Sequence, residues 1–168
     1  MPTPWSKVNE VFFELVEEDS GFFHYYNATD EESYALAVER ANSLLRAAAA
    51  RMMRSCNCEI DFTDTYVDEE SEEIYFSADL TEEEINLLAN LQYEGYLKRD
   101  MSKLKAFRHG FTPSDLQVFS PANDRKTFIE MYNTVCEENK TALDDYKRRD
   151  RLTNAPKGID YLSFDEEG

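Results

Sequence analysis

The chain has 168 residues, 42% of them hydrophobic and 13% aromatic, which suffices for a single domain with its own core. Its 35 acidic and 18 basic residues give a formal net charge of −17. Nucleic acid and anionic membranes repel such a chain, so a generic nucleic-acid binder or membrane-surface protein is disfavoured. No apolar run is long enough to span a bilayer and no secretory signal is visible, so we expect a cytosolic protein.

Residues 1–28 are predicted to form a short helix and an aromatic linker. The helix is expected to open at Thr3 and Pro4. Apolar residues recur at three- and four-residue spacing and predict one stripe: Val8, Val11, Phe12, Leu15 and Val16. The linker contains four aromatic residues: Phe22, Phe23, Tyr25 and Tyr26. They either cover one end of the bundle or anchor an interface between subunits, where such residues are enriched.

Three further helices are predicted in residues 29–152. Two of them open with a capping box, Thr29 with Glu32 and Thr81 with Glu84. The first continues to about residue 54 and the second to about residue 110, and a fourth helix follows the turn at 120–123 and ends near residue 149. The expected fold class is therefore mainly α, a helical bundle of three to four helices within a single domain, with a small acidic β-hairpin insertion and an extended C-terminal arm.

The hairpin is expected in residues 57–80, where apolar residues alternate with acids and no base occurs. Two short strands are predicted, Ile60 to Phe62 and Ile74 to Phe76, with an acidic tip between them. An acidic face toward a channel lumen or a partner would comprise Asp61, Asp64, Asp68, Glu69, Glu70, Glu72 and Glu73.

Residues 153–168 are predicted to be the extended arm, because Pro156 and Gly158 interrupt a segment that is nevertheless rich in apolar residues. Its candidate interface residues are Ile159, Tyr161, Leu162 and Phe164. Alternating apolar residues in an extended tail suit strand addition to the sheet edge of a neighbour.

The negative charge is unevenly distributed along the chain. Residues 1–32 carry a net −7 and residues 57–84 a net −12, whereas residues 33–56 and 85–111 each carry +3. This pattern is typical either of helix caps and a soluble loop, or of a negative surface that meets a basic partner or passing DNA. Mimicry of DNA by spaced carboxylates is a further reading, although the helices also carry arginine and lysine.

Motifs for catalysis or cofactor binding are missing from the sequence. The five glycines are isolated, so no phosphate-binding loop is present, and the two histidines accompany no nucleophile motif. Cys56, Cys58 and Cys136 lack the spacing of a zinc site. We expect no enzyme activity, no cofactor and no metal.

Four strings carry a resemblance to a known family: SYALAVERA at 33–41, YLKRDMSKL at 96–104, FSPANDRKTF at 119–128 and RDRLT at 149–153. In these strings and in its layout the chain resembles the head-to-tail connector, or neck adaptor, proteins of tailed bacteriophages. The N-terminal helix with Trp5 has no counterpart in that pattern, so the resemblance implies no role for it.

The resemblance implies a structural virion protein that forms a ring below the portal through which phage DNA passes. Its implied partners are copies of itself, the portal protein and the next neck or tail-completion protein, with no membrane. Its implied location is the virion neck, after synthesis in the host cytoplasm. A wall of carboxylates would let DNA pass without holding it. The alternative is an acidic DNA-mimic inhibitor of a nucleic-acid-binding host protein.

Overall fold

The computed structural model of the chain describes residues 1–17, 20–23, 25, 27–56, 58–110 and 121–157. It is mainly helical with a small antiparallel hairpin, which confirms the predicted fold class. The elements in chain order are α1 (Trp5–Leu15), α2 (Ser20–Phe23), α3 (Asp30–Ser55), β1 (Thr65–Val67), β2 (Ile74–Phe76), α4 (Glu82–Gly110) and α5 (Pro121–Arg148).

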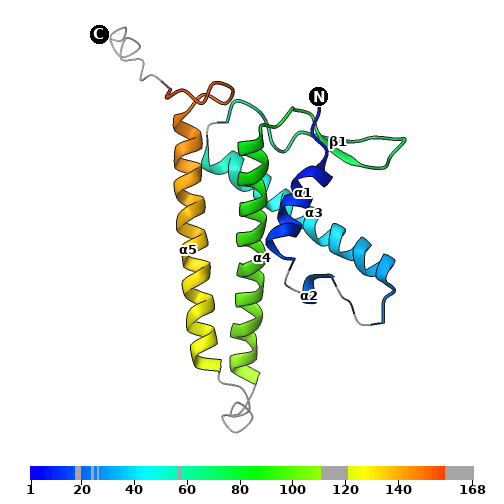
Figure 1. Cartoon of the computed structure of the whole chain (residues 1–168), viewed down its shortest axis with the longest axis vertical. Helices are drawn as coiled ribbons and strands as arrows, with labels where there is room; N and C mark the ends of the chain where they lie inside the picture. Colours follow the sequence, from blue (N-terminus) through cyan, green and yellow to red (C-terminus); the bar gives the residue numbers. More distant parts are fainter. Residues whose placement is uncertain (18–19, 24, 26, 57, 111–120, 158–168) are drawn as a thin grey trace.

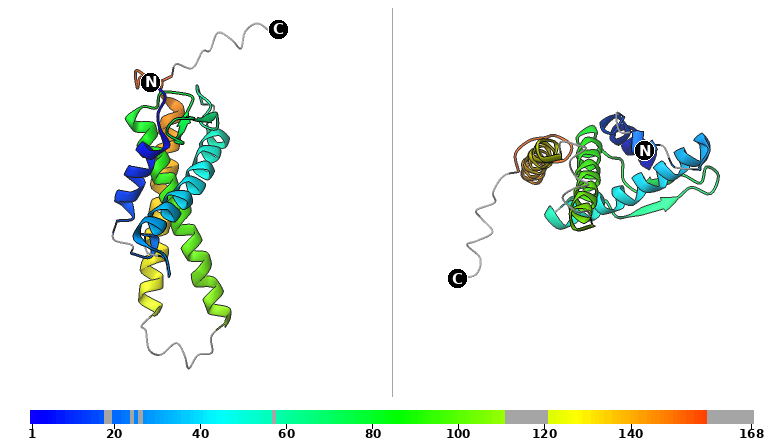
Figure 2. Two further views of the ribbon diagram at one scale, coloured as in Figure 1. Left: turned by 90° about the vertical axis from the view of Figure 1, so that its right-hand side faces the viewer. Right: turned by 90° about the horizontal axis from the view of Figure 1, so that it is seen from below.

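Helix α4 is the centre of the bundle, because it contacts α1, α3 and α5. Helices α4 and α5 lie side by side and run in opposite directions, while α3 crosses α4 obliquely (Figures 1 and 2). The hairpin leaves the end of the bundle where the N-terminus lies and projects on the side away from α5. The last turn of α5 lies at this same end of the molecule.

Both predicted capping boxes are present and explain where α3 and α4 begin. At α3, the Thr29 Oγ1 accepts from the Glu32 backbone N–H at 3.3 Å, and the Glu32 carboxylate accepts from the Thr29 N–H at 2.9 Å. At α4, the Thr81 N–H donates to the Glu84 carboxylate at 2.7 Å and the Glu84 N–H donates to the Thr81 Oγ1 at 3.3 Å. Each box satisfies backbone donors that have no partner inside the helix.

Small residues let α3 approach α4 closely. On α3, four alanines are buried: Ala37, Ala41, Ala48 and Ala49. On α4, a Cβ added to Gly95 would stand 3.4 Å from the Leu44 Cδ2.

The buried amide of Gln92 donates to the Asn9 Oδ1 at 3.0 Å and to the Ala41 carbonyl at 3.1 Å. A polar network therefore joins α1, α3 and α4 within the core.

The N-terminal helix differs from its prediction in two respects. It begins at Trp5, and neither Thr3 nor Pro4 caps it with a side chain. The Thr3 hydroxyl oxygen instead accepts a hydrogen bond from the Leu80 N–H at 2.8 Å, which draws these first residues toward the hairpin. Leu15 is 41% exposed, so the buried stripe consists of Val8, Phe12 and Val16.

Candidate functional site

The acidic hairpin is held to the bundle by the N-terminal segment. Strand β1 pairs antiparallel with β2, with Tyr66 opposite Tyr75. On the other edge of β2, the Phe76 N–H donates to the Thr3 carbonyl at 2.9 Å and the Thr3 N–H donates to the Ala78 carbonyl at 3.2 Å. The N-terminal residues thus form a short antiparallel bridge to β2, with Pro4 opposite Tyr75, a role that their sequence did not indicate.

The predicted strand from Ile60 to Phe62 is wrong, since the first strand begins at Thr65. The Asp61 carboxylate accepts from the Thr63 backbone N–H at 2.7 Å and from the Thr63 hydroxyl at 2.5 Å. This local turn competes with strand pairing, as Asp side chains commonly do. Phe62 is fully buried against Tyr146, with ring centroids 6.3 Å apart.

The tip of the hairpin is ordered by hydrogen bonds of its own. The Asp68 carboxylate accepts from the Ser71 N–H at 3.0 Å and from the Ser71 hydroxyl at 2.6 Å. The Asp68 N–H donates to the Glu73 carbonyl at 2.9 Å, and Glu72 has a positive φ of 56°. The tip therefore holds its acidic side chains on a defined turn.

Five of the seven predicted acidic-face residues are exposed: Asp61, Asp64, Glu69, Glu70 and Glu72. Asp68 and Glu73 are half-buried. Hydrogen bonds from the Thr63 hydroxyl and backbone lower the pKa of Asp61, and those from the Ser71 hydroxyl and backbone lower the pKa of Asp68. The hydrogen bonds therefore favour the charged form of both carboxyl groups.

The hairpin also presents an aromatic surface beside these acids. The rings of Tyr66 and Tyr75 are stacked with centroids 5.6 Å apart and planes inclined by 14°. Tyr66 is 44% exposed and its neighbour Val67 is 59% exposed. The Tyr75 hydroxyl donates to the Glu73 carboxylate at 3.3 Å, and burial together with Glu73 raises the pKa of Tyr75.

The first residues of the predicted arm are not extended. After α5 the chain folds back, with the Asp150 N–H donating to the Ala155 carbonyl at 2.8 Å and the Lys157 N–H to the Arg148 carbonyl at 2.7 Å. The Lys157 Nζ also pairs with Glu59 at 2.8 Å. Residues 149–157 thus form a closed loop against the bundle, which corrects the predicted start of the arm at residue 153. The four predicted arm residues Ile159, Tyr161, Leu162 and Phe164 lie outside the described residues.

A buried ionic cluster fixes this C-terminal loop to the start of α4. The Glu84 side chain is fully buried and accepts hydrogen bonds from the Tyr146 hydroxyl at 2.7 Å and from the Arg151 guanidinium. Arg151 also donates to the Asp79 carbonyl, in the segment between β2 and α4. The loop of residues 149–157 therefore lies at the end of the bundle that carries the hairpin.

The aromatic linker divides between the core and the surface. Phe22 is fully buried, with ring centroids 5.3 Å from Phe12 and 5.5 Å from Tyr96, and the Arg40 guanidinium lies 4.7 Å over its ring. Phe22 thus covers the bundle and is not available to a second subunit, which corrects its assignment to an interface. Phe23 and Tyr25 are half-buried, and Tyr26 lies outside the described residues.

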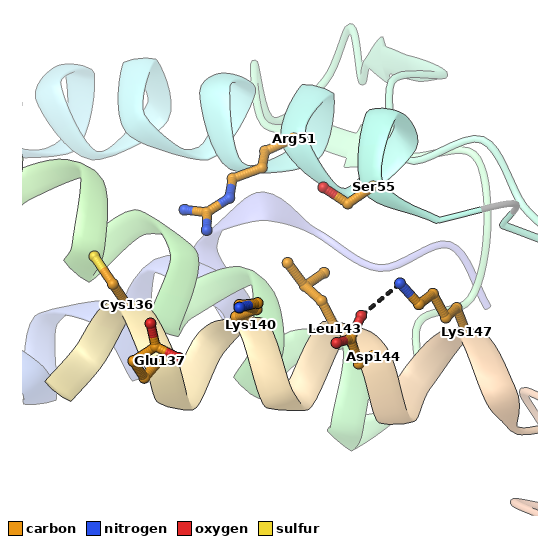
Figure 3. Close-up of a pocket in the computed structure, with 8 residues that line it drawn as sticks. All are labelled: Arg51, Ser55, Cys136, Glu137, Lys140, Leu143, Asp144 and Lys147. Atoms are coloured by element: carbon orange, nitrogen blue, oxygen red, sulfur yellow. Dashed lines mark ion pairs between the residues drawn. The ribbon is translucent and has the colours of Figure 1, made fainter. Parts of the chain in front are cut away.

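A pocket of about 480 Å³ lies between α3 and α5 (Figure 3). Sequence reasoning did not find it, although the seven-residue spacing of Lys140 and Lys147 on one helix face could have drawn attention to it. The Arg51 guanidinium pairs with the Glu94 carboxylate of α4 at 2.5 Å, and that carboxylate also accepts from the Asn139 amide at 2.9 Å. The lining residues are Arg51, Ser55, Cys136, Glu137, Lys140, Leu143, Asp144 and Lys147.

The three cysteines are free thiols. Burial raises the pKa of Cys56 and of Cys136, and burial with the neighbouring Cys56 raises the pKa of Cys58 to about 12. Among the residues that the structure describes, no three or more histidine, cysteine or acidic side chains are grouped to hold a metal ion. No helix within those residues has the length and apolar character needed to cross a membrane.

Comparisons of the chain with protein-family models, with curated proteins and with solved structures found no match.

Proposed function

We propose that this chain is a structural protein of the tailed-bacteriophage neck, a head-to-tail connector that forms a ring below the portal. The observation that carries the proposal is the acidic hairpin, which projects from the end of the bundle at which α5 ends (Figure 1). A connector needs an exposed surface for its neighbours and a surface that does not hold DNA, and the hairpin offers both in one element.

The charge of the hairpin supports this role physically. Glu69, Glu70 and Glu72 are exposed, and local hydrogen bonds favour the ionised form of the Asp61 and Asp68 carboxylates. Carboxylates repel the phosphates of DNA, whereas a basic lining would bind them and release counterions. The hairpin would face the lumen of the ring or a protein partner.

The position of the C-terminal loop supports the second part of the proposal. Arg151 and Lys157 attach residues 149–157 to the bundle, so the eleven residues that follow start from a fixed point. These residues include Ile159, Tyr161, Leu162 and Phe164, which are suitable for strand addition to a portal or to an adjacent subunit.

The most direct test is the mass of the purified chain alone and mixed with portal particles of its phage, measured by native mass spectrometry. We expect several copies of the chain to bind each portal particle as a ring. A chain that stays strictly monomeric and ignores the portal would contradict the proposal.

The DNA-mimic alternative has a separate readout. A mimic would displace DNA from a basic host protein, whereas a connector would leave such complexes intact. Outside the hairpin, exposed acids and bases alternate, as on α5, where Glu137, Glu138 and Asp145 lie near Lys140, Lys147 and Arg148. This mixture favours the connector, because a mimic needs carboxylates along an extended face.

A further inference from the structure

The residues that line the pocket between α3 and α5 carry one more positive than negative charge, although the whole chain has a net charge of −17. Three of its eight lining residues are basic, Arg51, Lys140 and Lys147, against the two acids Glu137 and Asp144. Arg51 and Ser55 reach into it from α3, and the other side chains approach from α5 (Figure 3). Leu143, which is buried, forms part of its wall.

The ion pairs at the pocket show which cation is available to a new ligand. Arg51 is paired with Glu94, and Lys147 is paired with Asp144 at 2.5 Å. Lys140 is exposed and has no ion pair within the described part of the chain. Its ammonium group can therefore take a carboxylate from another molecule. Glu137, one turn earlier, and Asp144, one turn later, are the acids that would oppose such a ligand.

The hairpin tip of the same chain has the complementary charge but cannot reach this pocket. Residues 68–73 contain five acids and no base, and Glu69, Glu70 and Glu72 are exposed. The hairpin projects from the side of the bundle opposite α5, so the two surfaces face away from each other (Figures 1 and 2). A hairpin that enters this pocket must therefore belong to a second copy.

We propose that the pocket between α3 and α5 receives the acidic hairpin tip of a neighbouring copy, with Lys140 pairing with its carboxylates. The two contacting surfaces differ, so the interface is heterologous, and repetition of such an interface closes into a ring when the rotation between copies permits it. This inference rests on the proposed connector function. That function allows the hairpin to face either the lumen of the ring or a protein partner, and the inference selects a partner, the adjacent subunit.

The contact is electrostatic and on the outside of the bundle, which predicts a strong dependence on salt. At an ionic strength of about 0.1 M the screening length is about 10 Å, and it falls to about 3 Å at 1 M. The loss of association caused by Lys140→Glu should therefore shrink as salt rises. Salt also screens the repulsion between two chains of net charge −17, but that repulsion acts in the wild type and in the control variant alike.

Charge reversal tests the proposal. We expect Lys140→Glu to weaken self-association at least tenfold in sedimentation velocity runs over a range of concentrations at low salt. Lys126→Glu is the matched control, because Lys126 is an exposed lysine of the same helix about 21 Å away along its axis. It should leave self-association unchanged, and circular dichroism should show both variants folded.

Two further variants make the result specific to this pair of surfaces. Glu70→Lys alone should also weaken association, and its combination with Lys140→Glu should restore at least part of it, because the reversed charges attract again. Glu137→Gln should strengthen association by removing the opposing acid. A combination as weak as the single variants, or a Lys140→Glu protein that associates like wild type, would overturn the proposal.

The competing candidate for the pocket is the C-terminal arm, residues 158–168, of a neighbouring copy. A chain that ends at Lys157 should associate with itself as the full chain does. Loss of association in this truncated chain, together with wild-type behaviour of Lys140→Glu, would assign the pocket contact to the arm and reject the hairpin. If the wild-type chain forms rings on portal particles while Lys140→Glu does so equally well, the connector function stands and the pocket contact falls. A wild-type chain that remains monomeric with and without portal particles rejects both.

Discussion

Arg151 and Glu84 form a buried ion pair across 67 positions of sequence, with the Arg151 Nε 2.6 Å from the Glu84 Oε1. The Glu84 side chain is fully buried and that of Arg151 is 12% exposed. The same carboxylate accepts the Thr81 N–H in the capping box of α4. One side chain thus caps a helix and anchors the C-terminal loop.

The first prediction concerns this pair. Arg151→Ala should lower the free energy of unfolding by about 3 kcal/mol, because it leaves the Glu84 carboxylate buried without its cation. Urea unfolding followed by circular dichroism measures the change. Arg149→Ala, which removes an exposed arginine two residues earlier, should change stability by less than about 0.5 kcal/mol. Equal effects of the two variants would contradict the structural role of the pair.

The second prediction separates a core residue from a surface residue in the aromatic linker. Phe22→Ala should destabilise the monomer by about 3 to 5 kcal/mol, since it removes a fully buried ring that packs on Phe12 and Tyr96. Tyr25→Ala, at a half-buried position, should cost clearly less. Thermal unfolding at low protein concentration distinguishes this from an interface role, in which Phe22→Ala would weaken association and spare the monomer.

The third prediction concerns acid stability. Burial raises the pKa of Glu94, but hydrogen bonds from Arg51 and Asn139 lower it by more, so the net pKa lies below 4.5. The unfolded state therefore takes up a proton at a higher pH than the folded state does. The stabilisation by Glu94 is complete above pH 4.5 and is lost as the pH falls through the lower folded pKa.

Glu94→Gln tests that linkage. Below pH 4.5 the variant should show a shallower fall of unfolding free energy with pH, by up to about 1.4 kcal/mol per pH unit for one proton. Glu138→Gln replaces an exposed carboxylate of α5 and serves as the control. Identical slopes for Glu94→Gln and wild type would show that this carboxylate does not link folding to protonation.

The fourth prediction concerns thiol reactivity. Cys58 has a pKa of about 12 against an ordinary 9.0, so its thiolate fraction at pH 8 is about a thousandfold lower than that of an ordinary thiol. Labelling with iodoacetamide, followed by peptide mass spectrometry, should proceed at least a hundredfold more slowly at Cys58 in the folded chain than in urea. Equal rates in both conditions would mean that the site is open to solvent.

The fifth prediction separates the C-terminal loop from the arm. A chain that ends at Lys157 should keep its thermal midpoint and lose portal binding, because the closed loop remains while the apolar arm residues are removed. Deleting residues 153–168 should also lower the midpoint, since the pairing of Lys157 with Glu59 and of Asp150 with Ala155 is lost. Normal portal binding by the shorter truncation would remove the arm from the proposed function.

The helices could be predicted from the sequence because their signals are local. Thr29 with Glu32 and Thr81 with Glu84 lie within one turn of each other, so sequence spacing alone places their side chains in contact. The wrong prediction of a strand from Ile60 to Phe62 also has a local cause, because the turn at Asp61 and Thr63 occupies the same residues as the alternating pattern. Strand alternation and an Asp-x-Thr turn compete over the same few residues.

The remaining features depend on contacts between distant parts of the chain. Arg151 is one basic residue among several near the end of α5, and only the fold shows that it meets Glu84. The pairing of Thr3 with β2 has no sequence pattern of its own, because two extended residues suffice for it. The pocket likewise needs α3 and α5 to be placed before Arg51 and Lys140 can be seen to face the same space.

The N-terminal segment covers one edge of the small sheet and leaves the other edge, along β1, open within the described residues. The unpaired backbone groups of an uncovered edge strand can pair with the edge strand of a second copy, and repetition of this pairing produces aggregates. Here that edge is only three residues long, between Asp64 and Asp68, so two such edges would bring like charges together. Before it docks on a neighbouring copy, the hairpin can therefore stay exposed at high local concentration without nucleating fibres, a property that a chain assembling in many copies requires.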